Sequence, residues 1–63
     1  MLTLDQAKEL AATRSRDRDR AQFINRYYYH SQRGKQPELR YVVEEDSKNT
    51  RTVHTYMHGE CVE

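Results

Sequence analysis

The chain has 63 residues, of which 33% are charged and 35% hydrophobic, and its formal net charge is +1. A chain of this length buries only about 60% of the surface that its unfolded form exposes, which excludes a multi-domain enzyme, a dinucleotide-binding domain and a large closed active-site cavity. No apolar run reaches the roughly 20 residues of a membrane span, and the N-terminus lacks the basic-then-apolar order of a secretory signal. We therefore expect one cytoplasmic domain over residues 1–63, without membrane contact, and Cys61 alone cannot supply an internal disulfide to stabilise it.

The first predicted element is a helix over about residues 4–18. Thr3 followed by Gln6 fits a capping box, and Asp5 is favourably placed near the positive end of the helix dipole. Small and apolar residues then recur at helical spacing and define one narrow stripe that predicts the buried side of the helix. The stripe consists of Leu4, Ala7, Leu10 and Ala11.

The segment from Arg14 to Arg20 alternates arginine with serine or aspartate. As a helix it would hold arginine–aspartate pairs three residues apart, and as a loop it would be a flexible arm rich in guanidinium groups. No apolar residue anchors it in either case, so we expect it to be solvated or to contact a partner. Its candidate contact residues are Arg14, Arg16, Arg18 and Arg20.

From Ala21 onward the pattern favours a strand, which we place at residues 23–31. Three consecutive tyrosines suit a pleated sheet. We assign the face with Phe23, Tyr27 and Tyr29 to the core, which leaves Ile24, Arg26, Tyr28 and His30 on the other face. A second helix across residues 20–32 stays open, and so does the face assignment, because a shift of one residue exchanges the two sets.

Two further strands are predicted after a polar loop, at about residues 39–44 and 52–58, separated by a turn. Short connections between successive strands indicate an antiparallel meander. The predicted fold is therefore α+β, with one N-terminal helix packed on one face of a three-stranded antiparallel meander. The expected core is small enough that we also expect a homodimer or a stabilising partner. It consists of Leu4, Leu10, Ala11, Phe23, Tyr27, Leu39, Tyr41, Val43, Val53 and Met57.

The opposite face of the predicted sheet is the main candidate site. Tyrosines beside arginines and histidines are typical of protein-binding hot spots and of surfaces that bind single-stranded nucleic acid, although a half-exposed sheet of good strand formers is the ordinary alternative. Residues 1–40 carry a net charge of +4 and residues 41–63 one of −3, but the overall pI near 7.9 lies below the value of about 9 that is usual for basic nucleic-acid binders. The candidate contact residues on this face are Arg26, Tyr28, His30, Arg40 and Tyr56.

A zinc site is a weaker candidate. His54, His58 and Cys61 would share one side of a helix, with His30 as a fourth ligand, but on a strand Cys61 joins the histidines only if Gly59 turns the chain. No second cysteine accompanies them, so three surface histidines and a free thiol are the simpler interpretation.

The exclusions above limit the functions that we expect of this chain. We expect no enzyme and no cofactor, because the chain has only two glycines, so no glycine-rich phosphate loop, and no nucleophile paired with a base. The leading hypothesis is a non-enzymatic binding or regulatory module that occupies a surface of a protein complex handling nucleic acid, as small inhibitors encoded by phages and other mobile elements do. The alternative is direct binding of single-stranded nucleic acid, with tyrosines stacked on bases. We expect a protein partner before a nucleic acid.

Overall fold

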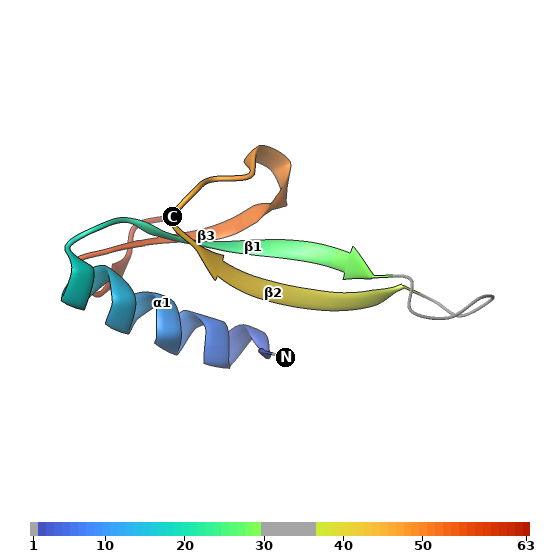
Figure 1. Cartoon of the computed structure of the whole chain (residues 1–63), viewed down its shortest axis with the longest axis horizontal. Helices are drawn as coiled ribbons and strands as arrows, with labels where there is room; N and C mark the ends of the chain where they lie inside the picture. Colours follow the sequence, from blue (N-terminus) through green and yellow to red (C-terminus); the bar gives the residue numbers. More distant parts are fainter. Residues whose placement is uncertain (1, 30–36) are drawn as a thin grey trace.

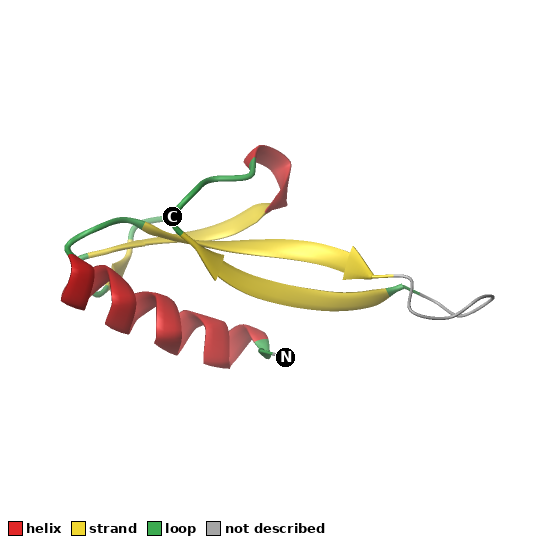
Figure 2. Cartoon of the chain, in the orientation of Figure 1, coloured by secondary structure: helices red, strands yellow, loops and turns green. Residues whose placement is uncertain are grey.

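The computed structural model of the chain describes residues 2–29 and 37–63. One helix, α1 (Leu4–Arg18), packs on a four-stranded antiparallel sheet, as Figures 1 and 2 show. The strands are β1 (Gln22–Tyr29), β2 (Glu38–Glu44), β3 (Thr52–Met57) and β4 (Glu60–Cys61), with a short 3-10 turn, η1 (Asn49–Arg51), before β3. Their order in the sheet is β2-β1-β3-β4. The predicted α+β class and the N-terminal helix are confirmed, but the sheet has four strands rather than three. The strand order also differs from the predicted meander, because β1 lies between β2 and β3.

The helix begins and ends where its local sequence predicts. The hydroxyl of Thr3 accepts a hydrogen bond from the backbone N–H of Gln6 at 3.2 Å, and the Gln6 side chain accepts one from the Thr3 N–H at 3.0 Å, which completes the capping box. Asp19 closes the last turn in the left-handed conformation, with φ 51°. The tyrosine-rich segment is a strand over the residues described, so the alternative of a second helix there is wrong.

The fourth strand follows a tight turn at the end of the last predicted strand. His58 and Gly59 both have positive φ, 53° and 81°, as the two central residues of a type I′ hairpin turn require. The chain therefore reverses, and Glu60 pairs with Met57. The Gly59 N–H donates to the Ser15 hydroxyl at 2.9 Å, which joins this turn to the last turns of α1.

The helix packs closely on the sheet because its buried side carries only small residues. Ala7, Ala11 and Ser15 are fully buried, one helical turn apart, while Leu4 and Leu10 pack at the margin of the core. The stripe is thus the predicted one extended by Ser15. Its hydroxyl is satisfied in the interior by donating to the Ala12 carbonyl at 3.0 Å and accepting from Gly59.

The predicted core face of β1 is wrong by one residue. Ile24 is fully buried beneath α1 and pairs with Val43 of β2, whereas Phe23 is only partly buried and faces the opposite side. Apolar side chains occur on both faces of this strand, so alternation alone could not select the inner one. The assignment of β2 is correct at Val43 and Tyr41, which belong to the core, but Leu39 is 39% exposed.

In β3 the strict alternation is broken by a register shift. The pairing with β1 passes from Ile24–His54 to Asn25–Thr52, so Val53 has no partner in β1. An extra residue of this kind is a β-bulge. It allows both Val53 and Tyr56 to pack against the core, although their spacing would put them on opposite faces of a regular strand.

Both edges of the sheet are partly covered by the ends of the chain. Leu2 forms an isolated bridge with Tyr41 on the outer side of β2. On the other side of the sheet, Val62 and Glu63 continue the pairing of β4 with β3 through hydrogen bonds to the backbone of Thr55. Coverage of this kind limits edge-to-edge pairing. None of the helices described is long and apolar enough to cross a membrane.

Candidate interaction surface on the β1–β2 arm

The β1–β2 hairpin continues past the N-terminal end of α1, as Figure 1 shows. We call residues 26–29 and 38–41 the arm. Three large side chains of the arm are exposed: Tyr28 at 54%, Tyr29 at 41% and Leu39 at 39%. Clusters of exposed large side chains are the feature that most often marks an interaction surface on a small protein.

Each of the three consecutive tyrosines has an arginine over its ring. The Arg40 guanidinium lies 4.6 Å from the ring centre of Tyr29, that of Arg51 lies 5.5 Å from Tyr27, and that of Arg26 lies 5.8 Å from Tyr28. All three distances fall within the range of cation–π attraction. Tyr27 and Tyr29 are also close to each other, with ring centres 6.4 Å apart.

Strand alternation divides these groups between two faces. Arg26, Tyr28 and their cross-strand neighbours Tyr41 and Leu39 lie on the side of the sheet that α1 covers further along. Tyr27 and Tyr29, with Arg40 opposite Tyr27, lie on the other side, which we call the open face. Arg51 reaches the open face from η1. The arm therefore presents tyrosine and arginine in both directions.

A hydrogen-bonded network fixes the base of the open face. Asn25 is fully buried, and its amide nitrogen donates to the Glu44 carboxylate at 3.2 Å and to the Asp46 carbonyl at 3.0 Å. Its amide oxygen accepts from the Thr52 hydroxyl at 2.5 Å. The Tyr27 hydroxyl donates to the same Glu44 carboxylate at 2.5 Å. The network ties β1 to the connection between β2 and β3.

The hydrogen bond between Tyr27 and Glu44 shifts the pKa values of both side chains. The pKa of Glu44 is lowered, mainly by the hydrogen bond from Tyr27. Burial opposes this effect in part, and the hydrogen bond from Asn25 adds to it. The bond between Tyr27 and Glu44 is also the main cause that raises the pKa of Tyr27. Because the pKa of Glu44 is lower in the folded than in the unfolded chain, its contribution to stability is present at neutral pH and is lost as the pH falls through the lowered value.

We therefore expect Tyr27→Phe to destabilise the protein at neutral pH but to have little effect in acid. Phenylalanine keeps the ring beneath Arg51 and removes only the hydroxyl. Urea unfolding at about pH 7 and about pH 3 measures the difference between the two proteins, which should shrink in acid as Glu44 protonates. A difference of equal size at both pH values would contradict the assigned role of the hydroxyl.

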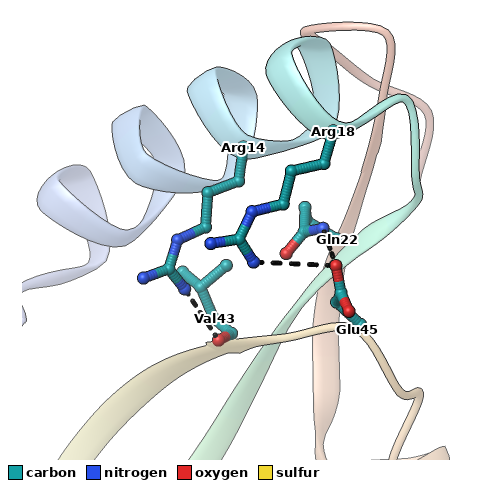
Figure 3. Close-up of polar contacts among 5 residues, drawn as sticks. All are labelled: Arg14, Arg18, Gln22, Val43 and Glu45. Carbon is teal, nitrogen blue, oxygen red and sulfur yellow. Dashed lines mark hydrogen bonds and ion pairs between the residues drawn. The ribbon is translucent and has the colours of Figure 1, made fainter.

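The arginine-rich segment from Arg14 to Arg20 is not a flexible loop, because α1 continues to Arg18. Arg14 donates to the Val43 carbonyl at 3.5 Å, and Arg18 forms a loose ion pair with Glu45 at 3.7 Å (Figure 3). Glu45 also accepts a hydrogen bond from the buried Gln22 at 3.2 Å. Arg14 and Arg18 thus join α1 to the end of β2. Arg16 and Arg20 are exposed.

The structure does not bring the predicted contact residues together into one surface. Arg26, Tyr28 and Arg40 belong to the arm, but Arg40 lies on the opposite face from the other two. Tyr56 is only 8% exposed and belongs to the core, so its predicted position on an open sheet face is wrong. His30 lies outside the described residues.

The candidate zinc ligands are not brought together into one site either. His54 Nδ1 and Cys61 Sγ approach to 3.9 Å, because β4 turns back beside β3. His58 instead sits in the turn, where its Nδ1 lies 3.1 Å from the Asp19 carboxylate. Within the part of the chain that the structure describes, no group of three histidine, cysteine or acidic side chains is arranged to hold a metal ion.

Sequence reasoning missed three residues of the arm and one that reaches it from η1. Tyr27, Tyr29 and Leu39 are predicted in the core, and Arg51 has no predicted role. The signal for the tyrosines was present in their run of three, since alternation must place at least one on each face. Nothing local could predict Arg51, because it meets Tyr27 only through the pairing of β1 with β3.

Comparisons with protein-family models, with curated proteins and with solved structures found no match to this chain.

Proposed function

We propose that this protein is a non-enzymatic binding module that contacts a partner protein through the arm. The observation that carries the proposal is the projection of Tyr28, Tyr29 and Leu39 beyond the helix, with an arginine stacked on each tyrosine. Tyrosine and arginine are the residues that most often dominate the binding energy of protein interfaces. A chain that occupies a partner's surface in this way excludes other ligands from it, which is how a small regulator or inhibitor acts.

Two features favour a protein over a single-stranded nucleic acid. Stacking on bases needs open ring faces, whereas each tyrosine ring of the arm already has a guanidinium over one face. The exposed Leu39 opposite Tyr28 adds an apolar group that suits a pocket in a protein.

The proposal predicts that Tyr28→Ala weakens the complex by more than about 1 kcal/mol without unfolding the protein. The partner is first captured from a cell extract on immobilised wild-type protein, then purified and titrated against each variant by calorimetry. Thr13→Ala, an exposed position on the outer side of α1, is the matched control and should bind like the wild type.

Two results would overturn the proposal. One is equal affinity of the purified partner for the wild type and Tyr28→Ala. The other is tight, strongly salt-dependent binding of labelled single-stranded oligonucleotides in an anisotropy titration, with no protein that binds in a Tyr28-dependent way. That second result would assign the arm to nucleic acid instead, because phosphate neutralisation makes affinity fall steeply with salt.

A further inference from the structure

An arginine lies over the ring of each of the three tyrosines: Arg26 over Tyr28 on one face, and Arg51 over Tyr27 and Arg40 over Tyr29 on the other. Cation–π attraction at these distances restrains the rotation of each guanidinium before a partner binds. Its N–H donors lie in the plane of the group, where they can form hydrogen bonds. Less side-chain entropy is then lost when such a group binds, which favours affinity.

Two of these guanidinium groups have no acidic partner. Arg40 pairs with Glu38 at 3.2 Å. Arg26 and Arg51, in contrast, form no ion pair with the carboxylates of the described residues. They differ in this from Arg18, which pairs with Glu45 at the other end of the sheet. Each face of the arm is thus lined by one guanidinium without an ion pair among the described residues, Arg26 on one face and Arg51, which reaches over Tyr27 from η1, on the other.

A planar guanidinium with free donors matches a carboxylate, with which it can form two parallel hydrogen bonds. We infer that the arm binds carboxylates on both of its faces, and that its partner is a protein with an acidic groove that encloses the arm. A flat partner surface could meet only Arg26 or Arg51, because the two lie on opposite sides of β1. This inference rests on the proposed function, for which it names the chemistry of the partner.

The test uses a synthetic peptide in which glutamate alternates with serine. The protein is labelled with 15N and with 13C in the tyrosine rings, and the peptide is titrated in while the arginine side-chain N–H signals and the ring signals are followed by NMR. We expect saturable shifts at both Tyr28 and Tyr27, that is, on both faces. A peptide with glutamine in place of glutamate should give no shift at either tyrosine.

Three variants that each remove one positive charge locate the sites. Arg26→Gln should weaken the binding that is measured at Tyr28 and leave the binding measured at Tyr27 unchanged, and Arg51→Gln should do the reverse. Each should weaken binding at its own face by about threefold, as expected for one exposed ion pair. Arg20→Gln, which removes the same charge from an exposed position before β1, should leave both sites unchanged.

The inference is overturned if only one face responds, if the glutamine peptide acts like the glutamate peptide, or if Arg20→Gln weakens binding as much as Arg51→Gln. Tighter binding of oligothymidylate at the same arginines would overturn it in favour of nucleic acid. Failure here is separable from failure of the proposed function, because the Tyr28→Ala titration with the purified partner does not depend on the peptide.

Discussion

Ile24→Ala is expected to lower the free energy of unfolding by about 3–4 kcal/mol. Ile24 is the largest fully buried side chain and the centre of a core that otherwise contains two alanines, Val43 and Tyr56. A domain of this size is stabilised by roughly 3–9 kcal/mol in total, so the variant should be partly unfolded in buffer. Urea denaturation followed by circular dichroism measures the loss, and Ile24→Val should cost only about 1 kcal/mol.

Phe23→Ala provides the matched control, because it truncates the neighbouring residue on the opposite face of β1. Phe23 is larger than Ile24 but only partly buried, so its truncation should cost less. If Phe23→Ala proved the more damaging change, the inner face of β1 would be the one that alternation first suggested, and the assignment of Ile24 to the core would be wrong.

Asn25→Ala is expected to cost about 2–3 kcal/mol, the second largest effect. The substitution removes three hydrogen bonds in the interior and leaves the Thr52 hydroxyl and the Asp46 carbonyl without their partner. It should also release the β2–β3 connection, which faster amide hydrogen exchange over residues 45–52 would reveal.

Two companion variants separate this network from a general effect of substitution in the same region. Thr52→Val keeps the shape of the side chain and removes the bond to Asn25 together with the bonds of the Thr52 hydroxyl to the Lys48 N–H and the Ser47 hydroxyl, and should cost about 1–2 kcal/mol. Thr50→Ala, at an exposed position with no bond to the network, should be neutral. Equal stability of Asn25→Ala and Thr50→Ala would show that the buried amide contributes nothing.

The local features of the fold could be predicted from the sequence. The capping box at Thr3 and Gln6 fixes where α1 begins, and the alternation of Leu39, Tyr41 and Val43 identifies both the existence and the inner face of β2. The signal in β2 is strong because Arg40 and Glu44, two of the three residues at the alternate positions, are charged. In β1 the signal was weak, since Phe23 and Ile24 are neighbours and either could face inward.

The remaining features depend on contacts between residues far apart in the chain. The buried hydroxyl of Ser15 accepts a hydrogen bond from Gly59, and Tyr56 faces inward because it pairs with Gln22, on the same face of β1 as Ile24. The candidate surface shows the same division. The run of tyrosines predicts groups on both faces of a strand, but the position of Arg51 over Tyr27 depends on the pairing of β1 with β3.

The hydrogen bond between Ser15 and Gly59 also bears on how the chain acquires its structure during synthesis. The helix is made first, yet its docking site requires β1 from the middle of the chain and the turn at His58 and Gly59 near its end. Because contacts between distant residues slow folding, the last turns of α1 should gain their full tertiary support only when the turn at residues 58–59 is available. A purified fragment of residues 1–57 should therefore be digested by protease faster than residues 1–63.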